Sequence, residues 1–376
     1  MKKSLMALAI ASTVAAPAFA QSSGVTLYGI VEDGLTFVNN SAGKKLYEMQ
    51  SGVIQGSRWG LKGSEDLGGG LKTLFQIESG FDLNTGKLGQ GNLGFGRQAY
   101  VGLSSEHLGM LTLGRQYDLI VDFVGPTTFN GNWGGYFAHA GDIDNTNNAF
   151  RVNNTIKYTS LNYGGLQFGG MYAPGGVAGS FGANSTIAAG ASYSHGPLYV
   201  GAGYFYARNP ATQFPDGNWQ ANSPIHQVNQ VGPFGYVGHP GNEQIIGVGG
   251  TYAIGSALLG LDYTNTRFDD ANGTTSSVTF NNYEAWAQYA VTPAATLGAG
   301  YTFTEAKVNY NGQKPKYNQI NVLADYRLSK RTDVYMMGVY QRASGGANAD
   351  IYDGFLAQQS SNNSQTAVRI GIRHTF

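Results

Sequence analysis

Charged residues on predicted strands are the part of this sequence best suited to do chemistry. In "SRWGLKG", Arg58 and Lys62 fall on one parity, and Trp59 and Leu61 fall on the other. In "LKTLFQIESGF", Gln76 and Glu78 fall on the parity opposite to that of Phe75, Ile77 and Phe81. Successive side chains of a strand point to opposite faces, so these charges gather on a common interior face. Because a guanidinium stays charged at any relevant pH, the chemistry that this pattern predicts is a permanent electrostatic field.

The histidines form no local catalytic or metal-binding motif. They are spread over turns, loops and the last strand, and none forms the arrangement with a serine or a carboxylate that nucleophilic catalysis needs. No H-E-x-x-H pattern occurs either. We therefore expect no catalytic residue, no metal and no cofactor, although convergence of distant strands leaves an enzyme open as an alternative. The histidines are His107, His139, His195, His226, His239 and His374.

The composition narrows the fold class. The chain has 56 Gly, 24 Tyr and 19 Phe but only 12% charged residues, and it has no Cys. Disulfides and thiolate metal sites are therefore excluded. Beyond the N-terminus, no stretch approaches the roughly 20 apolar residues that a membrane-spanning helix requires. A membrane β-barrel and an extracellular all-β adhesin both fit this composition.

The N-terminus has the layout of a bacterial secretory signal. Two lysines precede an apolar stretch at 5–16, and the small residues Ala18 and Ala20 flank a cleavage point. We expect residues 1–20 to be removed and residues 21–376 to form one domain. Cleavage removes two of the 23 Lys+Arg and none of the 23 Asp+Glu, so the mature net charge is near −2. That balance argues against a nucleic-acid partner.

Strand-sized segments are separated by connections of two kinds, which alternate along the chain. Seven short turns and eight long connections predict sixteen strands. An even-numbered antiparallel set, with short turns at one rim and long loops at the other, is typical of an outer-membrane barrel. The short turns are Glu65–Gly69, Ser105–Gly109, Asn162–Gly165, His195–Pro197, Gly255–Ser256, Thr292–Ala294 and Ser329–Arg331. The long connections are Asn39–Gly52, Asp82–Gly94, Gln116–Val152, Ala173–Thr186, Ala207–Glu243, Asn265–Phe280, Glu305–Lys316 and Gln341–Gln365.

The two ends of the mature chain are predicted to pair and close the sheet. In "AVRIGIRHTF", the last segment, apolar residues alternate with polar and cationic ones, and "GVTLYGIVEDGLTFV" repeats this near the start. Each unpaired backbone group in hydrocarbon costs several kcal/mol, so an open edge is prohibitive. By parity Ile370 faces lipid and Arg369 faces the lumen. We therefore expect Ile370→Arg to impair folding and Arg369→Ala to be tolerated.

A soluble β-sandwich is an alternative fold with the same alternation of apolar and polar residues. It would place the apolar faces inward, but sixteen strands with asymmetric connections fit a sandwich poorly. Sixteen strands also leave a lumen wide enough for an aqueous channel, whereas eight are filled by side chains. We therefore predict an all-β fold, a sixteen-stranded antiparallel transmembrane β-barrel.

Several segments resemble the general porins of Gram-negative bacteria, particularly the beta-proteobacterial type. The segments are "VTLYG", "RWGLKGSEDLGGGLKTLFQIESGF", "RQAYVGLSSEHLGMLTLGRQYD" and "RIGIRHTF", spread over the whole mature chain. The resemblance implies an outer-membrane channel, usually trimeric, for ions and small hydrophilic solutes. It also implies short periplasmic turns, long extracellular loops and a third loop folded into the lumen. An outer-membrane barrel enzyme or a surface adhesin is the alternative function.

The resemblance further implies a basic side of the pore constriction, opposite the third loop. By resemblance Arg97 and Arg151 join Arg58 there, and Arg115, the last strand residue before the loop, is a further candidate. Lys62 faces inward by parity. Arginines on rigid strands favour anions, so we expect a modest anion preference despite the slightly negative total charge.

Carboxylates are expected to form the acidic side of the constriction. Those of the third loop, folded inward, would face the arginines and disfavour apolar solutes. Glu78, inward by parity, is expected to pair with the arginines and hold them rigid. The loop carries "VGPTTFNGNWGGYF" where some enteric relatives have an acidic Pro-Glu-Phe-Gly-Gly tip. The loop candidates are Asp118, Asp122, Asp142 and Asp144.

The C-terminal residues imply partners outside the chain. In the family that the sequence resembles, a terminal aromatic preceded by alternating apolar residues is read by the barrel-assembly machinery, and Ile370, Ile372 and Phe376 match this signal. The expected partners are outer-membrane lipid, that machinery, further copies of the chain in a homotrimer, and the permeating ions and small hydrophilic solutes.

Overall fold

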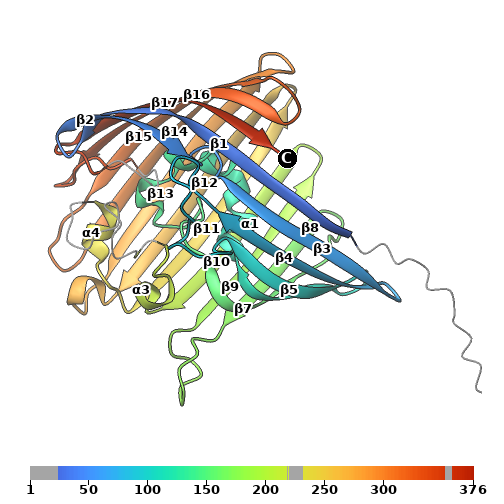
Figure 1. Cartoon of the computed structure of the whole chain (residues 1–376). Coiled ribbons are helices and arrows are strands. Elements are labelled where there is room, and N and C mark those ends of the chain that lie inside the picture. The colour runs from blue at the N-terminus through green and yellow to red at the C-terminus, as the bar shows by residue number, and fades with distance from the viewer. Residues whose placement is uncertain (1–23, 218, 220–231, 352–357) are drawn as a thin grey trace, which may run out of the picture.

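The described strands form one closed antiparallel sheet (Figure 1). The computed structural model describes residues 24–217, 219, 232–351 and 358–376. The expected signal peptide, residues 1–20, lies outside the described residues. The strands are β1 (Gly24–Ser41), β2 (Lys44–Ser51), β3 (Arg58–Gly68), β4 (Leu71–Gly80), β5 (Gln98–Ser105), β6 (Gly109–Gln116), β7 (Val152–Thr159), β8 (Leu166–Ala173), β9 (Thr186–His195), β10 (Leu198–Arg208), β11 (Asn242–Ile254), β12 (Ala257–Asp269), β13 (Val278–Ala290), β14 (Ala295–Val308), β15 (Lys316–Arg327), β16 (Thr332–Ser344) and β17 (Ser364–Thr375).

The seventeen segments occupy sixteen positions around the barrel. Strands β2 and β3 pair with successive parts of β1, so they are two halves of one barrel strand. The predicted number of sixteen strands is therefore confirmed. The long connection expected at 39–52 is corrected: β1 turns into β2 through Ala42 and Gly43, whose φ angles of 49° and 89° suit a two-residue hairpin. The break at 52–57 lies against the third loop, where Val53 O accepts a hydrogen bond from Gly135 N (2.9 Å).

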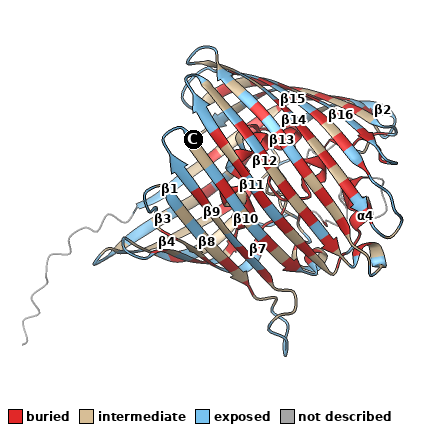
Figure 2. Ribbon diagram, turned by 180° about the vertical axis from the view of Figure 1, so that it is seen from behind, coloured by how far each residue is buried: buried red, intermediate tan, exposed pale blue. Residues whose placement is uncertain are grey.

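Exposure alternates along the strands, as Figure 2 shows by its bands of colour. Along β12, Leu259 and Leu261 are exposed, whereas Asp262 and Thr264 are buried. In a membrane barrel the exposed apolar face contacts lipid, and the other face lines the lumen. The predicted parity of β17 is confirmed, because Ile370 is 62% exposed and Arg369 is 0% exposed.

Short turns join the strands at one rim, and longer connections at the other rim carry short helices. The third long connection contains α1 (Leu119–Phe123), η1 (Gly125–Thr127), α2 (Phe129–Trp133), η2 (Gly135–Phe137) and η3 (Ala140–Asp142). The others are α3 (Pro210–Gln213), α4 (Pro233–Val237) and η4 (Ala271–Gly273).

In the part of the chain that the structure describes, no helix has the length and apolar character needed to cross a membrane.

The third loop runs along the inner wall of the barrel (Figure 1). Helix α1 lies so close to β10 that a Cβ added to Gly201 would be 1.8 Å from the carbonyl oxygen of Phe123. Farther along, Trp286 Nε1 on β13 donates to Thr127 O (2.8 Å), and Gln319 Nε2 on β15 donates to Tyr136 O (3.3 Å). Glycine at the wall thus permits the approach, and polar side chains of the wall satisfy the loop backbone.

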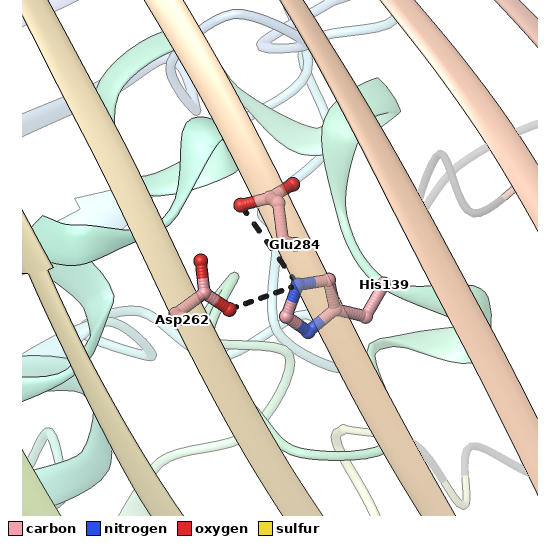
Figure 3. A group of neighbouring side chains, drawn as sticks. All are labelled: His139, Asp262 and Glu284. Carbon is pink, nitrogen blue, oxygen red and sulfur yellow. Dashed lines mark ion pairs between the residues drawn. The ribbon is translucent and has the colours of Figure 1, made fainter.

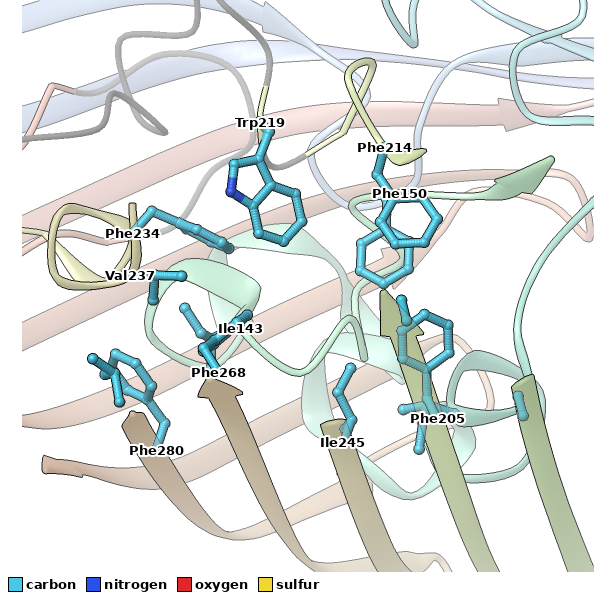
Figure 4. Packing of buried hydrophobic residues seen from close by; sticks show 14 of the residues in the cluster. Ile143, Phe150, Phe205, Phe214, Trp219, Phe234, Val237, Ile245, Phe268 and Phe280 are labelled. Carbon is cyan, nitrogen blue, oxygen red and sulfur yellow. The ribbon is translucent and has the colours of Figure 1, made fainter. Parts of the chain in front are cut away.

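Aromatic residues of the loops pack against aromatic residues at the ends of the strands, at the rim with the long loops (Figure 4). Phe150, at the end of the third loop, stacks on Phe214 with ring centroids 4.2 Å apart and lies 5.4 Å from Phe205 of β10. Trp219 meets Phe234 edge-on at 5.4 Å. These rings are buried inside the barrel mouth, where they position the third loop.

The seam between β1 and β17 contains a buried charged network. Arg369 donates through Nη2 to Glu32 Oε1 (2.5 Å) and Gln50 O (2.7 Å), and through Nε to the hydroxyl of Tyr335 (2.7 Å). Its Nη1 donates to Gly34 O and to the hydroxyl of Thr36, both at 3.0 Å. Because Arg369 and Glu32 are both fully buried, loss of the arginine would leave an unpaired carboxylate. This geometry reverses our expectation that Arg369→Ala is tolerated.

Candidate functional site

Glu78 on β4 is the centre of a polar network in the lumen. Its Oε1 accepts hydrogen bonds from Arg97 Nε (2.7 Å) and from the hydroxyl of Tyr117 (3.1 Å), and its Oε2 accepts one from the hydroxyl of Tyr28 (2.9 Å). Arg97 Nη2 also donates to the hydroxyl of Tyr117 (2.8 Å). Arg97 directly precedes β5, and Tyr117 directly follows β6, so the network joins the beginning of the third loop to the barrel wall.

Arg58 and Arg151 both lie close to Arg97. Arg58 donates through Nε to Gly56 O (2.8 Å), and a Cβ added to Gly56 would be 4.0 Å from Arg58 Nη2 and 3.0 Å from Arg97 Nη1. The guanidinium of Arg151 is 5.5 Å from the ring centroid of Tyr117, and that of Arg97 is 6.0 Å from it. Both cations therefore lie against one aromatic ring.

Arg151 stays positively charged although it is buried next to another arginine. Burial, and next repulsion from Arg97, lowers the pKa of Arg151 to about 10, so the group remains protonated at pH 7. Among the described residues, no carboxylate lies within ion-pairing distance of Arg58 or Arg151. These two cations therefore differ from the other arginines of the group.

Arg115 is neutralised by a carboxylate that our sequence reasoning missed. Its Nη2 forms an ion pair with Asp216, which follows α3 in the long connection between β10 and β11. Its Nε and Nη1 donate to Gly96 O and to the side-chain oxygen of Asn153, each at 2.7 Å. No local pattern in the sequence predicts this ion pair, because Asp216 is 101 residues from Arg115.

Lys62 lies apart from the arginines. It is four residues along β3 from Arg58, about 13 Å at the usual strand rise. Its Nζ is 5.2 Å from the ring centroid of Tyr28. The exposed side chain of Lys62 therefore adds positive charge to the lumen at a distance from the arginines.

Asp122 pairs with Lys157, a residue that the sequence pattern did not lead us to expect at the site. Its carboxylate forms an ion pair with Lys157 of β7, whose Nζ also donates to Tyr117 O (2.9 Å). Tyr117, Asp122 and Lys157 line a cavity of about 560 Å³, together with Gln98 and Tyr199. The cavity has a polar lining, as a path for hydrated solutes requires. Alternation along β7 could have marked Lys157 as inward-facing.

Asp118 and Asp142 bond within the third loop. Asp118 is the N-cap of α1: its Oδ1 accepts from Ile120 N (2.7 Å), and its Oδ2 accepts from Asn145 Nδ2 (2.6 Å). Burial raises the pKa of Asp118 to about 6. Asp142 accepts from Asn147 N (2.9 Å) and Ala149 N (3.1 Å). We expected both carboxylates to face the arginines, but both are fully buried. They bond within the loop instead, because the backbone N–H groups of a tight loop need acceptors.

Asp144 faces the opposite wall of the barrel. It accepts hydrogen bonds from Thr264 on β12 (2.5 Å) and Asn282 on β13 (3.1 Å), and it lies 2.6 Å from His139 Nδ1. Burial disfavours the charged form, but His139 outweighs it, so the pKa of Asp144 is lowered. The expected position of Asp144 opposite the arginines is thus corrected, because its partners are on the far strands.

Comparisons with known proteins agree along the whole chain. The sequence matches the Gram-negative porin family over residues 7–346. It is 30% identical to an outer membrane porin protein of Bordetella pertussis over 433 residues and 30% identical to outer membrane porin protein 32 of Delftia acidovorans over 393 residues, in each case with 100% of both chains covered. Major outer membrane protein P.IB of Neisseria meningitidis serogroup B is 26% identical over 393 residues, again with 100% of both chains covered.

Solved structures share the fold. An anion-selective porin from Comamonas acidovorans superposes with a TM-score of 0.76 at 24% identity, covering 94% of this chain and 100% of that one. The trimer form of OmpT from Vibrio cholerae gives a TM-score of 0.69 at 16% identity, covering 94% of this chain and 99% of that one.

This chain belongs to the Gram-negative porin family. It is an outer-membrane diffusion porin, in which a sixteen-stranded barrel encloses a water-filled channel for ions and small hydrophilic solutes. The comparisons point to a channel, and they lend no support to the enzyme and adhesin alternatives.

Proposed function

We propose that this porin has a modest preference for anions, set by Arg58 and Arg151. One observation carries the proposal: these two guanidiniums have no carboxylate partner among the described residues, whereas Arg97, Arg115 and Lys157 each pair with one. Five cations therefore share three carboxylates, which leaves two positive charges in excess around Tyr117.

The electrostatic effect of this excess does not depend on the total charge of the chain. A fixed charge dominates the potential within about one Debye length, roughly 8 Å at physiological ionic strength. The loop carboxylates Asp118, Asp142 and Asp144 are fully buried and bond to the loop or to the far wall. They screen Arg58 and Arg151 weakly, so a permeating anion meets a positive local field.

Reversal potentials in a planar bilayer test the proposal. Under a KCl gradient, the wild-type channel should pass more chloride than potassium, and Arg58→Gln/Arg151→Gln should shift the zero-current potential towards potassium. The effect should shrink at 1 M salt, where the Debye length is only about 3 Å.

The matched control removes two positive charges from the outer face. Arg208 and Arg267 are exposed at the ends of β10 and β12, outside the lumen. Arg208→Gln/Arg267→Gln should leave the reversal potential unchanged. Cation selectivity of the wild-type channel, or equal shifts in the two double variants, would overturn the proposal.

We also propose that the functional unit is a homotrimer. One of the solved structures with this fold is a trimer form, and the strands carry exposed apolar residues that can contact lipid or neighbouring copies. Three equal conductance steps for each insertion event would support this assembly. Single steps, together with a monomeric mass in detergent, would contradict it.

We further propose that the mature chain begins at residue 21 and reaches its membrane through the C-terminal signal. The basic and apolar N-terminal segment and the alternating residues up to Phe376 support this route. The intact mass of the protein purified from outer membranes tests the first part. A mass that still includes residues 1–20 would contradict it.

A further inference from the structure

A buried group of one histidine and two carboxylates lies where the third loop crosses the wall formed by β12 and β13 (Figure 3). His139 lies between η2 and η3, Asp262 is on β12, and Glu284 is on β13. Asp262 and Glu284 are directly opposite each other in the register of these strands, and all three side chains are fully buried. Two carboxylates in this position repel each other unless something positive lies between them.

His139 is oriented by Asp144. The Nδ1 atom of His139 is 2.6 Å from Asp144 Oδ2, and Thr264 and Asn282 also donate to that carboxylate. An Nδ1–H donated to Asp144 leaves the lone pair of Nε2 directed towards the other two carboxylates. A carboxylate that holds the outer nitrogen of a histidine is the usual support of a metal-binding imidazole.

The atoms that face one another lack hydrogen-bond partners. Among the described residues, none donates to either oxygen of Asp262, and His139 Nε2 has no hydrogen bond. By contrast, Glu284 is held in place, because its Oε2 accepts from Phe129 N (2.7 Å) and its Oε1 accepts from the hydroxyl of Thr302 (3.0 Å). Buried polar atoms are normally hydrogen-bonded, so these atoms of Asp262 and His139, which form only a long ion pair with each other, point to a missing ligand.

The distances between the three side chains are long for direct hydrogen bonds and leave room for an ion between them. His139 Nε2 is 3.4 Å from Asp262 Oδ1 and 3.9 Å from Glu284 Oε2. An imidazolium that donated directly to a carboxylate would lie at about 2.7–2.9 Å from it. Two ligands of one tetrahedral ion, each about 2.0 Å from the metal, lie about 3.3 Å apart. The first distance matches this ligand spacing, and the second exceeds it by about 0.6 Å.

We propose that His139, Asp262 and Glu284 bind a divalent transition-metal ion of the zinc class, which fastens the third loop to the β12–β13 wall. One imidazole and two carboxylates suit Zn²⁺ with a fourth, non-protein ligand, whereas Ca²⁺ and Mg²⁺ prefer sites made of oxygen atoms. The ion would offset the two facing carboxylates. Since the three side chains are fully buried, it would stabilise the loop without lying in the path of permeating solutes.

Metal stoichiometry of the refolded porin tests the proposal. The full mature chain is refolded from urea into detergent micelles with Zn²⁺ or Co²⁺ present and separated from free ion by gel filtration. Mass spectrometry of the metal content should then give one ion per chain. Co²⁺ should show the visible absorption of a tetrahedral complex. Wild-type porin that retains no metal would overturn the proposal.

Asp262→Asn is the decisive variant. It keeps the shape of the side chain and breaks no hydrogen bond of the described residues, yet it removes a charged ligand. Metal affinity should fall at least 10-fold, since even the loss of an outer-shell partner of a metal ligand costs about 10–100-fold. His139→Gln provides a second test at a different ligand.

Asp325→Asn is the matched control. Asp325 on β15 is also buried, and neither of its oxygens has a hydrogen bond among the described residues, but it belongs to no group of metal-ligand atoms. This variant should bind metal as the wild type does. Equal metal content in Asp262→Asn and Asp325→Asn would refute the site.

This outcome is independent of the proposed anion preference. Asp262→Asn should keep the wild-type reversal potential, and Arg58→Gln/Arg151→Gln should keep the metal. Loss of metal in Asp262→Asn should instead increase the current noise of single channels, because a less firmly held loop fluctuates within the lumen.

Discussion

Replacing Arg369 by alanine is expected to destabilise the barrel strongly at its closing seam. Arg369 is fully buried and donates five hydrogen bonds, to Glu32, Gln50, Tyr335, Gly34 and Thr36. Removing one partner of a buried ion pair typically costs about 3–5 kcal/mol.

The lower end of that range applies to this pair. After the substitution, Glu32 still accepts hydrogen bonds from Val53 N (2.5 Å) and from the hydroxyl of Tyr335. These donors stabilise the remaining carboxylate in part. We therefore expect the free energy of unfolding to fall by about 3 kcal/mol.

Urea unfolding of the protein in lipid vesicles, followed by tryptophan fluorescence, measures this loss. Arg267→Ala is the control, because the ion pair of Arg267 with Asp269 is exposed and should contribute under about 1 kcal/mol. Glu32→Gln in the Arg369→Ala background should recover part of the stability, since an unpaired amide is less costly to bury than an unpaired carboxylate. Additive losses in this double-mutant cycle, or an Arg369→Ala variant as stable as Arg267→Ala, would refute the reasoning.

Three further changes test other parts of the barrel. Ile370→Arg places a charge on the lipid face and should lower the unfolding free energy in vesicles by about 2–4 kcal/mol; an unchanged value would disprove the assigned face. Gly201→Ala should displace α1 from the wall and change single-channel conductance, because its Cβ would lie 1.8 Å from Phe123 O, whereas Ala202→Gly on the outer face should not. Deletion of Phe376 should lower the yield of assembled porin in cells but leave refolding in detergent largely intact, and normal surface assembly would contradict the assembly role.

Alternation along a strand predicted which residues face lipid and which face the lumen. Ile370 and Arg369 are adjacent in sequence, and the structure places them on the predicted faces of β17. The period of two is a local property of an extended chain, and lipid penalises a wrong face strongly. Local pattern was therefore sufficient for the fold class and for the number of barrel strands.

Alternation did not predict the interruption of the second barrel strand. Residues 39–52 were expected to be a long connection because they form a long polar stretch. They form a hairpin instead, since β2 continues the pairing of β1 up to Ser51. A loop and the water-exposed end of a strand can both be rich in polar residues. Polar composition alone therefore could not distinguish a loop from a strand at residues 39–52.

The tertiary structure determines which partner each charged side chain meets. Asp118 and Asp122 are four residues apart in one loop, yet the first caps α1 and the second pairs with Lys157. Composition shows that both can ionise, but the path of the loop decides which donor each one meets. Likewise, only the fold brings Asp216 to Arg115.

By itself, the sequence determined a closed barrel with a polar lumen and a charged interior, because these follow from a period of two and from the cost of unpaired backbone in lipid. Only the tertiary structure decided which charges are left without a partner and which histidine meets which carboxylates. His139 shows the difference, since Asp262 and Glu284 reach it from two neighbouring strands that lie far along the chain from it. Distances between side chains so far apart in sequence are set by how the loop packs against the wall, and no local pattern records that packing.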